Sequence, residues 1–397
     1  MPHNLQDQIV FKALDAFCIE IPSWGFANTG TRFGKFIQAA AASSIDEKLS
    51  DAGQVHAFTG CCPSVAVHVL WDFPDGLKSI PQAQALAKKY GVRIGAINPN
   101  VFQDQIYKYG SLGNPDATIR QAALDHLLES IEIGKQVRSR DVSLWFGDGS
   151  NYPGTANIRL RKAWFEEGLK TAHTHLSSEQ RLLVEYKPFE PAFYHTDIAD
   201  WGMGLLFARA AGPQAKVLVD TGHHYQAQNI EQIVAWLLSE KMLGGFHFND
   251  RRYADDDLTI GSIDPYQIFR IFHEIAFFEW EAGERVPIAY MIDQSHNLKN
   301  KMEEMIQTVG TAQELYAKAA LVEHAELSRH QDSCSLIDAE ECLKSAYQTD
   351  VRPYLREWRK ARGLAEDPLQ AFRQSGYLER ITKERGERNK SAGGSYA

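Results

Sequence analysis

The sequence has few cysteines and no long apolar run. Its five cysteines form no pair of CxxC motifs, so a zinc-ribbon site is excluded, and sparse, unpaired thiols are typical of cytoplasmic enzymes. No stretch approaches the ~20 apolar residues that a membrane helix needs. The first residues have neither the basic start nor the apolar stretch of a secretory signal. We therefore expect a cytoplasmic protein that does not bind membranes.

An excess of basic residues is also missing. Lysine and arginine number 42 against 51 acidic residues, which gives a net charge of −9. Affinity for nucleic acid comes mostly from clustered lysine and arginine, so this balance argues against a nucleic-acid partner. The apolar and charged fractions, 44% and 23%, are ordinary for a globular protein and exclude a largely disordered chain.

No GxGxxG motif follows the first predicted strand, where a dinucleotide-binding fold would carry one. Gly25, Gly30 and Gly34 are present there with a different spacing. The chain instead repeats a unit in which a short apolar run is followed by a helical pattern. Near-continuous apolar runs of this kind are typical of strands that are buried on both faces. The predicted strands are 17–22, 65–71, 92–98, 141–147, 182–187, 216–220, 243–248 and 288–292, and the predicted helices are 81–90, 116–137, 159–175, 198–211, 230–240, 263–278 and one long helix over 300–326.

This alternation predicts an α/β fold, a (β/α)8 TIM barrel with a C-terminal helical extension. A doubly wound open sheet is the competing fold. We expect the barrel to form a catalytic domain over residues 1–325. Residues 326–397 are then the helical extension, and the charged and then glycine-rich stretch 383–397 is expected to be a disordered tail.

Barrel active sites lie at the carboxyl ends of the strands, and four consecutive strands here end in charged or metal-ligating residues. A single strand-end carboxylate can simply cap the next helix. Four in succession are costly to bury unless they bind a metal, and three carboxylates with one imidazole suit Mn²⁺ or Mg²⁺. These residues are Glu185, Asp220, His247 and Asp293.

A second set of ligands is predicted beside the first. His223 follows Asp220 by three residues, and Asp255 and Asp257 lie two apart, so with a bridging Asp220 they can surround a second ion. The alternative for the aspartates is a solvated acidic loop. Lys187, two residues after Glu185, is expected inside the barrel, where it neutralises carboxylates and contacts a substrate oxygen.

Aromatic residues are expected to form the rim of the cavity. His68 ends a strand as either a buried core histidine or a sugar contact. The segment 24–36 combines glycines with Phe26, Phe33 and Phe36, which predicts a lid over the pocket, or over a neighbouring subunit's pocket in a tetramer. The alternative is a rigid connection packed on its own barrel. The rim residues are Trp24, Trp71, Phe102 and Trp145.

Several of these segments resemble the metal-binding motifs of the L-rhamnose isomerase family, whose wider relatives are the xylose isomerase-like barrels. The resemblance covers residues 15 to 325. It is carried by EYKP at 185–188, DTGHH at 220–224, FHFND at 246–250, MIDQSH at 291–296 and the loop WFGDGSNYPG at 145–154.

The resemblance implies a homotetramer of rhamnose catabolism that converts L-rhamnose to L-rhamnulose. Hydride moves between C1 and C2, and two divalent metals per subunit take the place of an organic cofactor. Mn²⁺ is expected, with Co²⁺, Mg²⁺ or Zn²⁺ as substitutes. The resemblance implies that Glu185, Asp220, His247 and Asp293 hold the substrate-binding metal and that His223, Asp255 and Asp257 hold the catalytic metal, sharing or approaching Asp220. Beside these roles we expect Asp293, Lys187 and His68 to be catalytic, and Trp145, Phe102, Trp71 and Phe33 to bind the substrate.

Other functions stay open at this point. The enzyme can be an isomerase for another aldose, such as D-allose or L-mannose, or a ketose 3-epimerase, although an epimerase with one metal leaves the second ligand set without a role. A metal-dependent DNA-repair nuclease is disfavoured by the net charge of −9. A non-catalytic metal or sugar-binding protein does not explain the paired second site.

Overall fold

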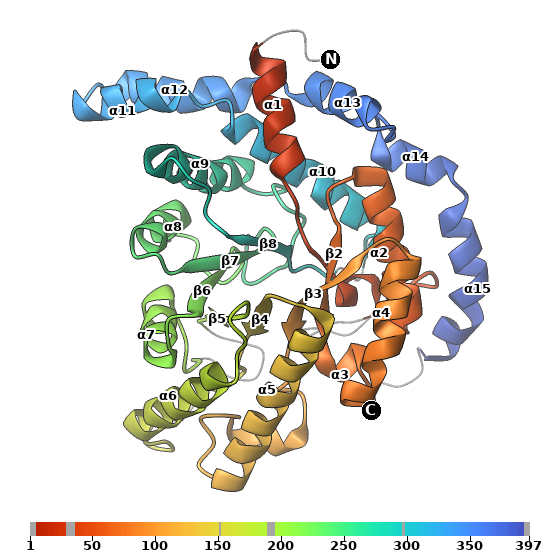
Figure 1. Ribbon diagram of the computed structural model, residues 1–397, viewed down its shortest axis with the longest axis vertical. Helices are drawn as coiled ribbons and strands as arrows, with labels where there is room; N and C mark the ends of the chain where they lie inside the picture. The colour runs from red at the N-terminus through yellow and green to blue at the C-terminus, as the bar shows by residue number, and fades with distance from the viewer. Residues whose placement is uncertain (1–4, 29–35, 151, 189–194, 296–297, 393–397) are drawn as a thin grey trace.

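Eight parallel strands in sequence order form the centre of the molecule (Figure 1). The computed structural model describes residues 5–28, 36–150, 152–188, 195–295 and 298–392. Glu20, just before the first strand, pairs with Met291 of the last, and its backbone carbonyl accepts a bond from Ile292 N at 2.9 Å. This pairing closes the sheet into a barrel, so the (β/α)8 prediction is confirmed. The strands are β1 Ile21–Pro22, β2 Ser64–His68, β3 Arg93–Asn98, β4 Asp141–Leu144, β5 Arg181–Glu185, β6 Ala215–Asp220, β7 Leu243–Phe248 and β8 Ala289–Ile292.

The strands are buried on both faces, as their near-continuous apolar runs predict. Residues that point outward, such as Leu182 and Val184, pack with the helices in the main core. Residues that point inward form a smaller core inside the barrel, where Leu183 and Leu218 lie with Met291. This inner core fills the barrel below the strand ends and gives the site there a rigid floor.

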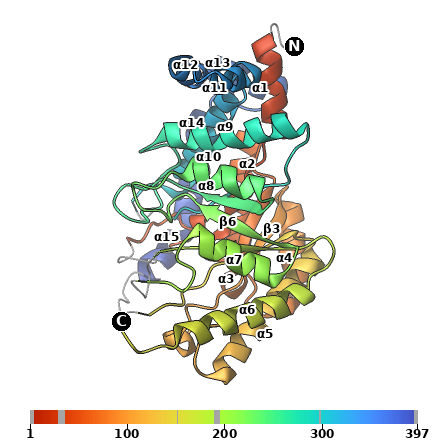
Figure 2. The same cartoon turned by 90° about the vertical axis from the view of Figure 1, so that its left-hand side faces the viewer.

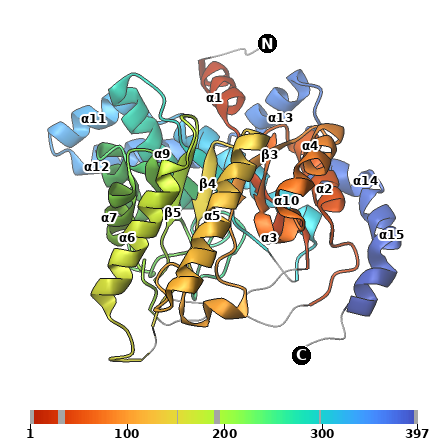
Figure 3. The same ribbon diagram turned by 60° about the horizontal axis from the view of Figure 1, so that its bottom comes forward.

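Helices on the outside of the barrel follow the strands. In Figure 2, α9, α8, α7 and α6 lie one below another, and Figure 3 shows α5 and α6 side by side in front of the sheet. Six of these helices, α5 to α10, begin at an Asp or Asn whose side chain accepts a bond from a backbone N–H of the first turn. The helices are α2 Ile45–Thr59, α3 Val69–Asp72, α4 Ile80–Lys89, α5 Ala117–Val137, α6 Ile158–Thr174, α7 Trp201–Ala211, α8 Ile230–Ser239, α9 Pro265–Ala282 and α10 Lys301–Ala319.

The remaining helices form an arc around the outside of the barrel, which runs from α11 at one end to α15 at the other (Figure 1). Val10 and Leu14 of the first helix form a separate small core with Leu355 and Trp358. The expected domain boundary at residues 325/326 falls inside α11. None of the helices within the described ranges is long and apolar enough to cross a membrane. These helices are α1 Leu5–Ala16, α11 His324–Asp332, α12 Leu336–Gln348, α13 Arg352–Ala361, α14 Pro368–Gln374 and α15 Tyr377–Ala392.

Two sequence predictions for the C-terminal region are wrong. The single helix over 300–326 is interrupted, because Glu323 has an extended ψ of 82° and a new helix starts after it. Residues 383–392 of the expected disordered tail are helical, since Arg385 forms a buried ion pair with Asp51 of α2 and Asn389 donates to the carbonyls of residues 39 and 41. Residues 393–397 lie outside the described residues.

Three strands are shorter than predicted by two residues or more. β1 covers only residues 21–22, where Pro22 has no N–H to extend the ladder. β2 ends at His68, because the backbone N–H of His68 donates to Asp72 and the chain turns into α3, which contains Trp71. β4 ends at Leu144, so Trp145 stands on the loop that follows.

Candidate metal and sugar site

The carboxyl ends of β5 to β8 bring four side chains together. Glu185 and Asp220 are the last residues of their strands, Asp220 is in register with His247, and Asp293 follows β8 directly. One ligand atom from each of these four residues lies within 4.8 Å of all the others. We call them the four-residue group. These residues converge because side chains alternate between the two faces of a strand, so neighbouring strands present inward-facing residues at the same level of the barrel.

A second group shares a member with the first. Ligand atoms of Asp220, His223 and Asp255 also lie within 4.8 Å of one another. The Nε2 atom of His223 is 3.3 Å from Asp255 Oδ2 and 3.7 Å from Asp220 Oδ2. Lys187 reaches the same Asp255 oxygen at 2.5 Å. Asp257 borders the same cavity with φ 50°, although among the described residues its carboxylate does not belong to the three that converge.

Burial and mutual repulsion disturb the ionisation of these residues. Burial, together with repulsion from Asp255 and Glu185, outweighs the attraction of His223 and raises the pKa of Asp220 to about 7. Burial acts to lower the pKa of His247, but Glu185 and Asp293 raise it to about 9. Protons on Asp220 and His247 thus neutralise part of the negative charge of the carboxylates, which a bound cation would otherwise neutralise.

The donor atoms fit a divalent cation. Glu185 Oε1 and both ring nitrogens of His247 are buried and form no hydrogen bond of normal geometry with a described residue, although His247 Nδ1 lies 3.2 Å from Glu185 Oε2 and His223 Nδ1 lies 3.3 Å from Glu185 Oε1. Burying such atoms without well-formed hydrogen bonds is costly, so a ligand shared by them is expected. Carboxylate oxygens with imidazole nitrogens suit Mn²⁺ or Mg²⁺ better than a metal that prefers thiolates.

Neighbouring groups fix the direction of these ligands. Asn249 Nδ2 and the backbone N–H of Gly222 donate to Asp220 Oδ1 at 3.0 and 2.7 Å. The Trp24 indole donates to Asp293 Oδ1 at 2.8 Å. His223 Nδ1 lies 2.9 Å from the carbonyl oxygen of Tyr186, so it donates there and Nε2 is left facing the two aspartates.

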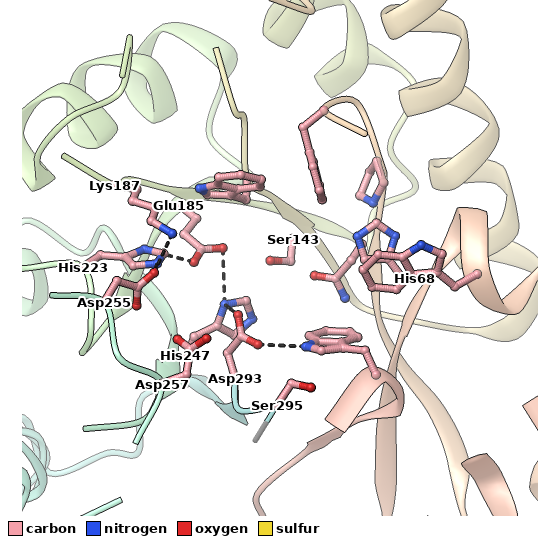
Figure 4. A pocket seen from close by; sticks show the side chains of 16 residues that line it. His68, Ser143, Glu185, Lys187, His223, His247, Asp255, Asp257, Asp293 and Ser295 are labelled. Atoms are coloured by element: carbon pink, nitrogen blue, oxygen red, sulfur yellow. Dashed lines mark hydrogen bonds and ion pairs between the residues drawn. The ribbon is translucent and has the colours of Figure 1, made fainter. Parts of the chain in front are cut away.

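The ligand groups form one wall of a cavity that holds about 150 Å³ of space open to small molecules. Figure 4 shows Glu185, His247 and Asp293 on one side, His68 on the opposite side and Ser143 between them. The opposite wall is aromatic: the rings of His68 and Trp71 are 3.9 Å apart, and those of Phe102 and Trp145 are 4.5 Å apart. Such a wall suits the C–H face of a sugar, while the acidic wall suits its oxygens.

The structure places nearly all sequence-predicted residues at this cavity. Phe33, and residues 29–35 of the expected lid, lie outside the described residues. His68 is neutral, because burial and then His126 and Lys48 lower its pKa to about 3. The predicted residues that line the cavity are Trp24, His68, Trp71, Phe102, Trp145, Glu185, Lys187, His223, His247, Asp255, Asp257 and Asp293, with Asp220 just behind them.

Sequence reasoning missed three polar residues of the cavity, Asn98, Ser143 and Ser295. A signal was present for two of them. Ser143 and Ser295 each lie two residues from a predicted site residue, Trp145 and Asp293, and strand alternation puts such neighbours on the same face. Asn98 ends β3 at the same level of the barrel.

Comparison with known proteins agrees with this geometry. Residues 64–308 match the family model described as xylose isomerase-like TIM barrel. A probable sugar isomerase from Mesorhizobium japonicum is 40% identical over 377 residues, 94% of this chain and 87% of that protein. One from Rhizobium meliloti is 39% identical over 375 residues, with coverage of 93% and 86%.

Among solved structures, a D-allulose 3-epimerase from Methylomonas sp. has the same fold, with a TM-score of 0.53, 14% identity, and coverage of 76% of this chain and 98% of that one. At this identity the likeness concerns the fold alone. The family match and the two probable isomerases extend across the strands that carry both ligand groups. The chain belongs to the xylose isomerase-like TIM barrel family.

Proposed function

We propose that this protein is a metal-dependent aldose–ketose isomerase that converts L-rhamnose to L-rhamnulose by a 1,2-hydride shift. One observation carries the proposal: two ligand groups share Asp220 on one wall of a cavity whose other wall is aromatic. The family relationship and the names of the similar proteins support sugar isomerisation. The choice of L-rhamnose depends on the motifs at 185–188, 220–224, 246–250 and 291–296.

Each ligand group would hold one divalent cation. The four-residue group would hold the first, and Asp220, His223 and Asp255, with Asp257 beside them, would hold the second. We propose Mn²⁺, with Co²⁺, Mg²⁺ or Zn²⁺ as substitutes. When bound, the two cations would polarise the sugar carbonyl and stabilise the negative charge that develops on the sugar oxygens.

The other side chains bind and orient the sugar. Trp71, Phe102 and Trp145 cover its apolar face and exclude water from the hydride transfer. Lys187 brings a positive charge to the oxygen where negative charge develops. His68, whose Nδ1 has no partner among the described residues, offers a neutral nitrogen to a sugar hydroxyl.

The proposed assembly is a cytoplasmic homotetramer. Tyr109, Tyr152, Tyr253 and Leu298, which follow different strands at the open end of the barrel, are each more than 60% exposed. Apolar surface gathered on one face favours an interface between subunits. Light scattering on the purified protein tests this, and a monomer at micromolar concentration would contradict it.

An aldose panel tests the activity. Enzyme stripped with EDTA and reloaded with Mn²⁺ is incubated with L-rhamnose, L-mannose and D-allose, and ketose formation is followed by chromatography. We expect the highest kcat/KM for L-rhamnose, and no ketose from a Glu185→Gln control. A higher value for another aldose would overturn the substrate, interconversion of ketoses alone would favour the 3-epimerase, and no turnover at all would overturn the proposal.

A further inference from the structure

A buried ion pair lies directly behind the aromatic wall of the cavity. The ammonium group of Lys48, on α2, is 2.7 Å from Asp72 Oδ1, on α3. The two side chains are 5% and 0% exposed, so neither charge is solvated. Within the described part of the chain, Asp72 is the one hydrogen-bond partner of the Lys48 ammonium. We call these residues the Lys48–Asp72 pair.

The second carboxylate oxygen of Asp72 joins the ends of two strands. Its Oδ2 accepts a bond from Ser23 Oγ at 2.5 Å and another from the backbone N–H of His68 at 2.8 Å. Ser23 directly follows β1, and His68 is the last residue of β2. The Asp72 carboxylate therefore fixes the positions at which β1 and β2 end and the loops above the barrel begin.

The two attached residues each deliver a ring to the cavity. Trp24 follows Ser23 and donates its indole N–H to Asp293, a member of the four-residue group. The His68 ring packs at a tilt of 36° against Trp71 and lies 6.0 Å from the Trp24 ring. The positions of the Trp24 and His68 rings, and the orientation of Asp293, thus depend on the position of Asp72.

Stability alone is a poor explanation for this arrangement. Removing two charges from water costs as much as their attraction returns, and apolar residues of similar size often serve equally well. The geometry indicates a different role, because the two oxygens of Asp72 accept from three groups: Oδ1 from Lys48, and Oδ2 from Ser23 and the backbone N–H of His68. Charge-assisted hydrogen bonds of this kind are shorter and roughly twice as strong as neutral ones.

We propose that the Lys48–Asp72 pair is a positioning pair that holds Trp24 and His68 at the spacing required to bind the sugar. Neither residue of the pair lines the cavity. The role in sugar binding rests on the proposed function, whereas the role in placing the rings does not. The experiment therefore measures ring position and sugar binding separately.

The test combines the double variant Lys48→Met/Asp72→Asn with a matched control. The control, Arg385→Met/Asp51→Asn, removes an equally buried ion pair, 5% and 2% exposed, from the same helix α2. Ring position is followed by ¹⁹F NMR on protein labelled with 5-fluorotryptophan, with the resonances assigned through Trp24→Phe and Trp71→Phe. Sugar binding is followed as KM and kcat of the Mn²⁺-loaded enzyme.

In the double variant we expect both resonances to shift and KM to rise by about 10-fold, with kcat changing by less than about 3-fold. In the control we expect unchanged resonances and an unchanged KM, with a lower Tm. Unmoved Trp24 and Trp71 resonances would overturn the positioning role, as would moved resonances with the wild-type KM. If the resonances shift in the double variant but the wild-type protein has no isomerase activity, the positioning role stands and the proposed function is rejected.

A second variant covers the case in which the double variant does not fold. Ser23→Ala removes one of the bonds to Asp72 without changing any buried charge. We expect it to shift the Trp24 resonance, and to raise KM by about 3-fold, the effect of losing roughly half to one kcal/mol of hydrogen bonding. A Ser23→Ala variant with the wild-type resonance and KM would overturn the proposal.

Discussion

The ammonium group of Lys187 lies 2.5 Å from Asp255 Oδ2, the oxygen that also lies 3.3 Å from His223 Nε2. Lys187 therefore forms an ion pair with a carboxylate oxygen of the second ligand group. A cation bound by that group and the lysine charge repel each other at this distance. We expect cation binding to shift Lys187 from Asp255 toward the sugar.

Replacing this lysine should separate metal binding from turnover. In Lys187→Met we expect the second Mn²⁺ to bind several-fold more tightly, because a nearby positive charge is gone, while kcat falls by about 100-fold or more through loss of charge stabilisation. Calorimetry gives the metal affinity and the ketose assay gives kcat. Lys216→Met is the control, because Lys216 lies at the opposite end of β6 from Asp220 and donates to the backbone carbonyl of Lys241. Weaker Mn²⁺ binding in Lys187→Met would contradict the assigned competition.

Chelation should abolish the activity without any organic cofactor being involved. We expect EDTA to remove turnover, and Mn²⁺ or Co²⁺ to restore it with no nicotinamide present. At 100 times its Kd a bound cation also stabilises the folded state by about 2.7 kcal/mol, so Tm should rise on reloading. Full activity after dialysis against EDTA, with metal content checked by mass spectrometry, would be incompatible with the two-metal proposal.

The two ligand groups should respond differently to mutation. Asp293→Asn removes a ligand of the four-residue group, so Mn²⁺ affinity and KM should both suffer. Asp257→Asn should lower kcat far more than it raises KM, because we assign the second group to the catalytic metal. Asn tolerates the left-handed backbone at position 257, φ 50°, so this variant keeps the local fold. Equal losses of affinity alone in both variants would show that the roles are assigned wrongly.

Metal affinity should increase with pH. The pKa of His247 is about 9 and that of Asp220 about 7, and both residues must lose their proton to act as ligands. Above pH 7 binding releases the His247 proton, and below pH 7 it releases both, so the Kd for Mn²⁺ should fall steeply from pH 6 to 9. Calorimetry in buffers of different ionisation enthalpy counts the protons. A Kd that does not change over this range would contradict the prediction.

The ligand groups were predictable because strand ends interrupt otherwise apolar runs. Glu185, Asp220 and His247 are the charged or polar residues that such runs deliver to one edge of a barrel, and local spacing is enough to find them. Asp257 was harder, since its loop has no repeating pattern and its direction depends on one left-handed residue.

Contacts between distant residues were beyond the sequence pattern. Ser23 and Asp72 are 49 residues apart, and nothing near either residue indicates that they bond. The segment after residue 383 looks solvated because it is highly charged, yet Arg385 is buried against Asp51. The helix break before α11 likewise has no local signal, because the residues around Glu323 are compatible with a helix.

The contact between α15 and α2 has a consequence for synthesis of the chain. Asp51 belongs to the first helix that follows a barrel strand, but its partner Arg385 lies 334 residues later in the chain. A nascent chain can pair most of its strands while this helix still exposes an unpaired acidic side chain. The contact between α2 and α15 therefore forms only after all eight strands of the barrel have been synthesised.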